Sequence, residues 1–290
     1  MTSRLTDVRS EHQLFFKCEQ FQRVGAFKFR GAYHALAHLT TEQKQRGVIT
    51  HSSGNHAQAL ALAAKLFSIR ATVVMPRTAA AVKRAAVRDY GAQVVECEPT
   101  LAARESAVAE WIGRTGATLI HPYDDARIIA GQGTAALELL QDVPDLQAIV
   151  APVGGGGLIS GTCLAMQAVA PHTQVIAAEP SGADDAYRSW KRGEWLPQTD
   201  PQTIADGLLT SLGQLTWPFV QRHVSQVVTV RDDEIRAAMR WLWERGKLLV
   251  EPSSATVLAA VWSEQFPLAA GARIGLILSG GNVDLDRFRW

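Results

Sequence analysis

The sequence predicts an α/β protein built from mostly parallel, twisted sheets flanked by helices. Short runs rich in β-branched residues alternate with longer alanine-rich runs along most of the 290 residues. The short runs are continuously apolar, which is typical of strands covered on both faces. Because consecutive parallel strands need a long crossover, usually a helix, this alternation favours parallel sheets over antiparallel ones.

Most predicted strands precede a predicted helix. In the first half of the chain we expect strands at 47–50, 71–76, 93–98 and 117–122, followed respectively by helices at 55–67, 79–92, 101–116 and 126–141. In the second half we expect strands at 148–153, 174–179, 227–230 and 273–281, and helices at 158–170 and 231–246. The longest irregular segment is 192–207, and irregular segments of that length are often functional.

Charge and cysteine content exclude several classes of protein. The chain carries 29 Lys and Arg against 28 Asp and Glu, so we expect no nucleic-acid or membrane partner. Cys18, Cys97 and Cys163 are odd in number and far apart, as expected of thiols that stay reduced. No apolar run reaches the roughly 20 residues that cross a membrane, and the polar N-terminus is not a signal peptide. We therefore expect a cytoplasmic protein.

Ligands of open parallel sheets bind beyond the carboxyl ends of the strands, so residues just after strands are candidates for a site. The segment HSSGNHAQ (51–58) follows a strand and opens a helix. Its hydroxyls, amide and imidazole lie where helix N–H groups point outward, which suits a carboxylate. An ordinary helix N-cap turn is the plain alternative.

The segment PVGGGGLISG (152–161) places four glycines between a buried strand and a helix. Without side chains in the way, their N–H groups can converge on a phosphate. The pattern is neither the usual dinucleotide fingerprint nor a P-loop, so a mononucleotide or the phosphate of a cofactor fits better than a dinucleotide. A merely flexible turn is the alternative.

Two single residues complete the candidates. Ser279, in LSGGNVD (278–284), ends a predicted strand and could face a ligand, although a β-turn explains the segment equally well. Lys28 stands between Phe27 and Phe29 at the start of a helix. Desolvation lowers the pKa of a lysine, as a lysine that forms a Schiff base requires. A surface lysine lying along apolar neighbours is the alternative.

Together these segments resemble the serine racemase and serine/threonine dehydratase family of fold-type II pyridoxal-phosphate enzymes, which are related to the β subunit of tryptophan synthase. KCEQFQRVGAFKFRGA, SSGNHAQA, PVGGGG and LSGGNVD occur in this order in that family. The resemblance continues through AGQGT (130–134), EPSGADDA (179–186), TIADG (203–207), TWP (216–218) and WERGKLLVEP (243–252). It covers nearly the whole chain and is closest to the eukaryotic-type serine racemases.

The resemblance implies roles in binding pyridoxal phosphate. Lys28 would bind the cofactor covalently through its amine. Asn55 would hydrogen-bond the 3-oxygen of the ring. Ser279 would face the pyridine nitrogen and leave it largely unprotonated, which makes the ring a weaker electron sink and suits β-elimination. The phosphate would be held by the N–H groups of Gly154, Gly155, Gly156 and Gly157.

The resemblance also implies how a substrate is handled. Its carboxylate would dock on Ser52, Ser53, Asn55 and His56. The Lys28 amine would remove the Cα proton, and the β-hydroxyl would leave as water. If Ser53 returns a proton from the opposite face, the same enzyme racemises its substrate.

A divalent cation is implied as well. Glu179, the Ala183 carbonyl and Asp185 match the cation ligands of the family, and hard oxygen ligands suit Mg²⁺ or Ca²⁺. An acidic surface loop is the alternative.

By the same resemblance we expect two α/β domains and a homodimer. Residues 1–46 and 126–290 would form a large cofactor-binding domain, and residues 47–125 a small, mobile domain on the substrate side. The expected activity is dehydration and deamination of L-serine or L-threonine to a 2-oxo acid and ammonia. The alternatives are a serine racemase, a dehydratase of threo-3-hydroxyaspartate or phenylserine, and a catalytically silent binder of the cofactor or of an amino acid.

Overall fold

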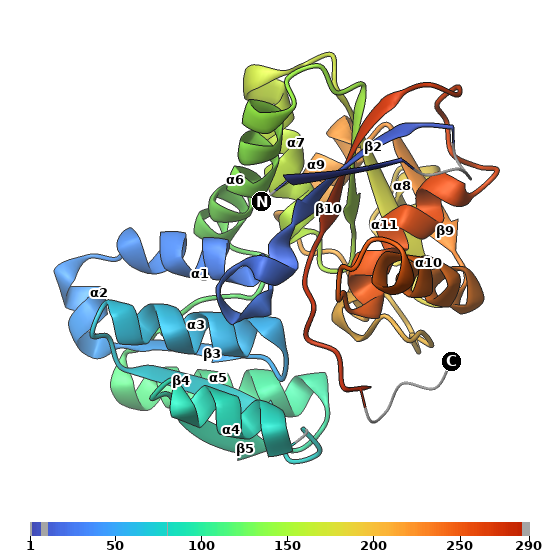
Figure 1. Ribbon diagram of the computed structural model, residues 1–290. Coiled ribbons are helices and arrows are strands. Elements are labelled where there is room, and N and C mark those ends of the chain that lie inside the picture. The colour runs from blue at the N-terminus through green and yellow to red at the C-terminus, as the bar shows by residue number, and fades with distance from the viewer. Residues whose placement is uncertain (1, 7–10, 80, 286–290) are drawn as a thin grey trace. The chain divides into compact units, whose positions relative to one another are not determined.

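The chain divides into two compact units. Unit 1 comprises residues 1–27 and 132–290, and unit 2 comprises residues 28–131. The computed structural model describes residues 2–6, 11–79 and 81–285 (Figure 1). Within these residues, no helix is both long and apolar enough to cross a membrane.

A six-stranded sheet with the order β1-β2-β10-β7-β8-β9 forms the centre of unit 1. Its strands are β1 (Thr2–Thr6), β2 (Gln13–Cys18), β7 (Ala148–Pro152), β8 (Gln174–Pro180), β9 (Gln226–Val230) and β10 (Arg273–Leu278). Only β1 runs antiparallel to its neighbour among the described strands, and the other pairs are parallel. The predicted parallel sheet is therefore confirmed for this unit.

Helices cover both faces of this sheet. They are α6 (Ala126–Asp142, which begins in unit 2), α7 (Gly157–Val169), α8 (Asp185–Arg192), α9 (Trp217–His223), α10 (Asp232–Glu244) and α11 (Pro252–Trp262), with short 3-10 turns η1 (Glu19–Phe21), η2 (Arg23–Gly25) and η3 (Asp206–Leu208). Successive side chains of β2 point to opposite faces. Leu14 and Phe16 accordingly share one core cluster with Leu258 of α11, whereas Phe15 shares another with Ile159 of α7.

Unit 2 contains a four-stranded parallel sheet with the order β5-β4-β3-β6. Its strands are β3 (Val48–His51), β4 (Ala71–Pro76), β5 (Gln93–Cys97) and β6 (Thr118–Leu119). Its helices are α1 (Lys28–Ala37), α2 (Thr41–Arg46), α3 (Asn55–Leu66), α4 (Ala81–Asp89) and α5 (Leu101–Thr115). Ile49, Val74 and Val108 form a core between the sheet and α5, and α3 packs against both α1 and α4.

The predicted fold class is confirmed, with differences in detail. Strand β6 has only two residues, whereas the sequence predicts a strand at 117–122. Strands β1 and β2 and helices α2, α8, α9 and α11 are absent from the sequence prediction. The boundaries of unit 2 also differ from the expected small domain, 47–125, because α1 packs against α3 and adds its residues to this unit. Movement of one domain relative to the other stays a prediction.

Candidate active site

Lys28 is the first residue of α1, and its side chain is half-buried in unit 2. Its Nζ donates a hydrogen bond of 2.8 Å to the carbonyl oxygen of Pro122, which follows β6. A lysine on an exposed face would instead extend its amine into water. The geometry therefore favours an amine held among protein groups at the carboxyl end of the unit 2 sheet.

The turn from β3 into α3 carries the predicted carboxylate-binding residues. Helix α3 starts at Asn55, and Gly54 at its N-cap makes no side-chain capping bond. The Ser52 Oγ accepts from the Gly54 N–H at 3.3 Å, so this hydroxyl serves the turn itself. The Ser53 hydroxyl makes no hydrogen bond within the described part of the chain. An uncapped helix start beside a hydroxyl without a protein partner can bind a carboxylate.

His56 is 2 % exposed and lies in the first turn of α3. Its Nε2 is 3.3 Å from the Ile120 carbonyl oxygen, which can only accept, so Nε2 carries the ring proton. Burial, together with the charge of Lys28, lowers the pKa of this imidazole well below 6.5. The ring is thus neutral, and its Nδ1 has a lone pair that would repel a carboxylate. If His56 contributes to binding the substrate carboxylate, it does so through its backbone N–H and not through its ring.

Two further histidines lie at the same sheet edge and were missed by the sequence reasoning. The His51 and His121 rings are 5.4 Å apart between centroids, and Tyr123 packs edge-on against His121 at 4.6 Å. Burial, and then His51, lowers the pKa of His121 to about 4. Burial, and then Arg104, lowers the pKa of His51. His51 is the last residue of β3 and His121 comes shortly after β6, and this position at the strand ends is the signal that could have identified them.

In unit 1, the predicted phosphate loop lies between β7 and α7, and its four glycines are buried. Gly156 is the N-cap of α7 with φ 88°, a conformation that favours glycine. A Cβ on Gly154 would lie 2.9 Å from the Leu208 Cα, and one on Gly156 would lie 2.7 Å from the Thr216 side chain. The Thr216 Oγ1 also donates to the Gly155 carbonyl at 2.8 Å.

This loop therefore needs glycine for steric reasons and is fixed by its neighbours. Its N-cap residue has no side chain with which to satisfy the first N–H groups of α7. A rigid, buried helix start of this kind fits a phosphate group. The flexible turn considered as the alternative does not agree with these contacts.

Ser279 follows β10 and is 3 % exposed. Its Oγ is 3.1 Å from the Oγ of Ser254, which belongs to α11. The Ser254 hydroxyl donates to the Gly280 carbonyl at 2.6 Å and accepts from the Gly280 N–H at 2.7 Å. Because Ser254 uses its only proton on Gly280, the Ser279 hydroxyl supplies the proton between the two serines. A ligand nitrogen can accept this proton in place of the Ser254 oxygen. The sequence reasoning did not identify Ser254.

The two predicted cation-binding carboxylates are buried in unit 1. Glu179 lies near the end of β8 and accepts from the N–H groups of Ala186 at 2.9 Å and Tyr187 at 2.7 Å. Asp185 Oδ2 accepts from the Leu212 N–H at 2.9 Å, whereas its Oδ1 is buried without a partner in the described chain. Burial, and then the charge of Asp185, raises the pKa of Glu179 well above 4.5. Two buried carboxyl groups, one of which has an oxygen without a partner in the described chain, are typical of a cation site. They do not agree with the alternative, an exposed acidic loop.

The donor set of this site is incomplete in side chains. Among the described residues, no group of three or more His, Cys, Asp and Glu side chains could hold a metal. A cation here would need oxygen atoms of the backbone, such as the carbonyl of the buried Ala183, and water. That requirement suits Mg²⁺ or Ca²⁺ and is unsuited to a soft metal.

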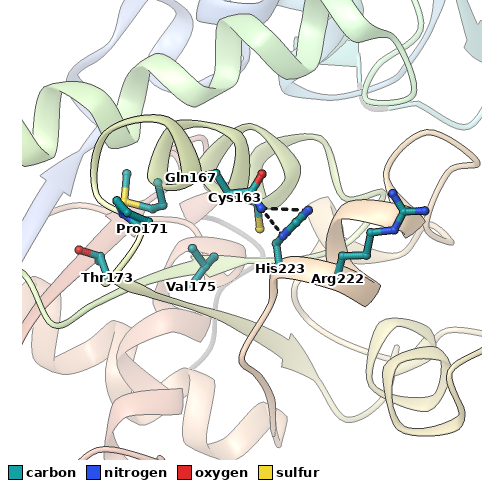
Figure 2. Close-up of a pocket in the computed structure, with 8 residues that line it drawn as sticks. Cys163, Gln167, Pro171, Thr173, Val175, Arg222 and His223 are labelled. Carbon is teal, nitrogen blue, oxygen red and sulfur yellow. Dashed lines mark hydrogen bonds between the residues drawn. The ribbon is translucent and has the colours of Figure 1, made fainter.

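A surface hollow of about 370 Å³ lies in unit 1 (Figure 2). Its lining consists of Cys163, Met166, Gln167, Pro171, Thr173, Val175, Arg222 and His223. Figure 2 shows Gln167 and His223 in contact, with 3.0 Å between their Nε2 atoms. Burial raises the pKa of the Cys163 thiol to about 12, so it cannot act as a thiolate at neutral pH. The hollow contains none of the predicted site residues.

Known proteins are similar to this chain over nearly its whole length. The chain is 52% identical over 278 residues to the beta-hydroxyaspartate dehydratase of Paracoccus denitrificans, covering 96% of this chain and 88% of that protein. It is 50% identical over 277 residues to the serine racemase of Dictyostelium discoideum, covering 94% of this chain and 86% of that protein.

Solved structures agree with the sequence relatives. The crystal structure of the Dictyostelium discoideum serine racemase matches with a TM-score of 0.93 at 48% identity, covering 97% of this chain and 92% of that one. The structure of maize serine racemase matches with a TM-score of 0.95 at 45% identity, covering 98% of this chain and 89% of that one. The family model described as "Pyridoxal-phosphate dependent enzyme" matches residues 3–280. The chain therefore belongs to the family of pyridoxal-phosphate-dependent enzymes and has the fold of the serine racemases in it.

Proposed function

We propose that this chain uses pyridoxal phosphate to eliminate water from a small β-hydroxy amino acid, with L-serine and L-threonine as the first candidates. The products are a 2-oxo acid and ammonia. The observation that carries the proposal is the Lys28 amine, 2.8 Å from the Pro122 carbonyl, in the same unit as the uncapped start of α3. A base and a carboxylate site are the two features that an amino-acid lyase must combine.

The cofactor would be held by residues from several elements. Lys28 would bind it covalently, the loop Gly154–Gly157 would bind its phosphate, Asn55 its 3-oxygen and Ser279 its ring nitrogen. When bound, pyridoxal phosphate supplies an electron-withdrawing ring that makes the substrate Cα proton more acidic. The fixed glycine loop and the donor proton of Ser279 are consistent with these roles.

Lys28 would take the Cα proton. A base must be neutral and oriented, and the Pro122 carbonyl accepts one of its N–H groups, which helps to orient the amine. The imidazole of His56 is neutral, because burial lowers its pKa well below 6.5, so it adds no charge that competes with the amine. The substrate carboxylate would accept from Ser52, Ser53 and the first N–H groups of α3, including that of His56.

A substrate panel tests this proposal. Holoenzyme is incubated with L-serine, L-threonine, D-serine, threo-3-hydroxyaspartate and phenylserine, and 2-oxo acid and ammonia are quantified together. Equimolar release of both products from L-serine or L-threonine supports the proposal. Cofactor binding without turnover of any member would overturn it and support the silent binder instead.

Two observations favour a second candidate, dehydration of 3-hydroxyaspartate to oxaloacetate and ammonia. The Paracoccus denitrificans relative at 52% identity carries the name of that activity. In unit 2, Arg104 is near enough to lower the pKa of His51, and its Nε is buried without a partner in the described chain. A guanidinium there can receive a second carboxylate. If Arg104→Lys lowers turnover of L-serine as much as turnover of hydroxyaspartate, this candidate loses its support.

Racemisation of serine is the remaining enzymatic candidate, and the serine racemase relatives favour it. It requires a proton donor on the face of Cα opposite Lys28, and the Ser53 hydroxyl makes no bond within the described chain that would compete. Chiral analysis of remaining serine in the same panel measures it. Appearance of the other enantiomer supports this activity, and its absence at high conversion excludes it.

We also propose Mg²⁺ or Ca²⁺ at Glu179, Asp185 and the Ala183 carbonyl, in a cytoplasmic homodimer. The buried Oδ1 of Asp185, which has no partner in the described chain, supports the cation. Light scattering coupled to gel filtration tests the dimer. A monomer at working concentration would remove it from the proposal.

A further inference from the structure

Two histidines on and just after α1 lie one helical turn apart and take no part in the site described above. His34 and His38 are separated by four positions, so both project from the same face of the helix. Their ring centroids are 4.1 Å apart, with an angle of 38° between the ring planes. His34 is half-buried and His38 is exposed, so solvent reaches the pair.

The hydrogen bonds of the two rings determine where their protons are. The Nδ1 of His34 is 2.7 Å from the Arg127 carbonyl oxygen, and the Nδ1 of His38 is 2.8 Å from the His34 carbonyl oxygen. A carbonyl oxygen can only accept, so each Nδ1 carries a proton. In the neutral rings, each Nε2 therefore has a lone pair. Within the described residues, neither Nε2 is engaged in a hydrogen bond.

This arrangement matches the way histidines bind metals. A metal-bound imidazole almost always donates its other N–H to a carbonyl or carboxylate, which fixes the tautomer and the ring orientation. Two histidines at a spacing of four on a helix are also the pair that binds zinc in helical metal motifs. Here backbone carbonyl groups accept both Nδ1–H groups, and His34 and His38 have this spacing of four.

The Arg127 guanidinium belongs to the residue whose carbonyl receives His34, and it is paired with Asp125 at 2.6 Å. A simpler explanation is that the rings only satisfy carbonyl groups near the end of α1. That explanation accounts for both Nδ1 atoms but gives no reason for the two rings to lie 4.1 Å apart.

We propose that His34 and His38 form a two-histidine site for a borderline divalent transition metal such as Zn²⁺, Ni²⁺ or Cu²⁺. Water would complete the coordination, because no group of three or more His, Cys, Asp and Glu side chains is available among the described residues. Imidazole nitrogen prefers these metals, whereas Glu179 and Asp185 offer the hard oxygen ligands that suit Mg²⁺ or Ca²⁺. The two sites therefore select different ions.

Metal bound here would link the last turn of α1, the helix that begins with Lys28, to the residue that follows it. The metal would bind the two histidines more tightly in the folded helix than in an unfolded chain. It would therefore stabilise unit 2 by mass action. Occupancy would thus be visible as a rise in melting temperature as well as in direct binding.

Titration of Ni²⁺ into tag-free holoenzyme, with Mg²⁺ present in excess, tests the site by calorimetry. His38→Gln is the main variant, because His38 is exposed and its loss removes one ligand without emptying a buried position. We expect Ni²⁺ to bind it at least about tenfold more weakly than wild type, and His34→Gln should behave alike. His172→Gln, at an exposed position in unit 1, is the matched control and should bind as wild type.

Electron paramagnetic resonance of Cu²⁺ supplies a second readout that does not depend on affinity. Wild type should show two imidazole nitrogens bound to copper at one equivalent, and His38→Gln should show one or none. If His34→Gln fails to fold because it loses the bond to the Arg127 carbonyl, His38→Gln alone decides the question. Equal Ni²⁺ affinity of wild type and His38→Gln, or a wild-type copper spectrum without paired imidazole nitrogens, would overturn the proposal.

Discussion

The starts of α3 and α7 look alike in sequence, since each follows a strand and a glycine, but they differ in their surroundings. A Cβ on Gly54, before α3, would meet nothing within 4 Å. A Cβ on Gly156, before α7, would lie 2.7 Å from Thr216, and one on Gly154 would lie 2.9 Å from the Leu208 Cα. One candidate anion site is open and half-buried, and the other is closed and buried.

This difference agrees with the different lifetimes of the ligands proposed for them. A cofactor phosphate stays through many turnovers, and a rigid, buried site favours slow release. A substrate carboxylate must enter and leave in every turnover, and an open turn with hydroxyl groups permits that. The same local chemistry, a helix N-terminus, can thus serve a resident or a passing ligand according to what packs around it.

The largest effect is expected from removing the proposed base, which lies in the same unit as the open site. Lys28→Ala should lower turnover by about a hundredfold to ten-thousandfold, because a positioned general base contributes a rate enhancement of that size. Product release under substrate saturation measures it. Lys65→Ala, at an exposed position in α3, is the control and should keep wild-type turnover. Normal turnover of Lys28→Ala would remove this residue from the mechanism.

Alanine at each of the two glycines tests the comparison directly. Gly156→Ala places a side chain at φ 88° and against Thr216, so we expect a loss of at least about 1–2 kcal/mol in stability. Cofactor retention after dialysis should fall as well. Gly54→Ala meets no neighbour within 4 Å, so only its backbone angles, φ −126° and ψ −141°, oppose the side chain, and it should lose less stability than Gly156→Ala. Equal melting temperatures and cofactor retention for the two variants would contradict the difference between the sites.

The sequence predicts the local parts of both sites but not their surroundings. Lys28, the SSGNH turn and the four glycines are each contiguous, so motif and flanking residues identify them. Thr216 reaches Gly155 across 61 positions, and Ser254 reaches Ser279 across 25. No local pattern encodes such contacts.

Strand order explains another omission. His51 and His121 come together because β6 pairs with β3 in parallel, which brings the ends of two distant strands to one edge. The alternation of strands and helices predicts a parallel sheet, but it does not say which strands are neighbours. The extent of unit 2 differs from the expected small domain for a similar reason, since the packing of α1 against α3 is tertiary.

Removing the cation should weaken the closed site more than the open one. Asp185 accepts from the Leu212 N–H at 2.9 Å, and the next residue, Gly213, donates to the Gly155 carbonyl at 3.4 Å. A cation on Asp185 would therefore stabilise the segment that clamps the glycine loop.

Chelator should lower both the melting temperature and cofactor retention, and Mg²⁺ or Ca²⁺ should restore them. At a hundredfold excess of the ion over its Kd, the expected stabilisation is about 2.7 kcal/mol. Asp185→Asn is the matched variant and should no longer respond to the ion. Identical melting curves with chelator and with added ion would exclude the cation.

The smallest expected effect is a change in the balance of activities at the open site. Ser52 and Ser53 are neighbours, but the Ser52 hydroxyl accepts from the Gly54 N–H, whereas that of Ser53 is uncommitted within the described chain. Elimination needs one base, and racemisation needs a proton donor on each face of Cα. Ser53→Ala should therefore lower the ratio of racemisation to elimination.

Ser52→Ala should raise KM for both activities and keep their ratio, because it disturbs the turn that receives the carboxylate. The ratio is measured by chiral chromatography of serine alongside pyruvate release. If both variants keep the wild-type ratio, Ser53 contributes only to carboxylate binding, and the second proton comes from another group.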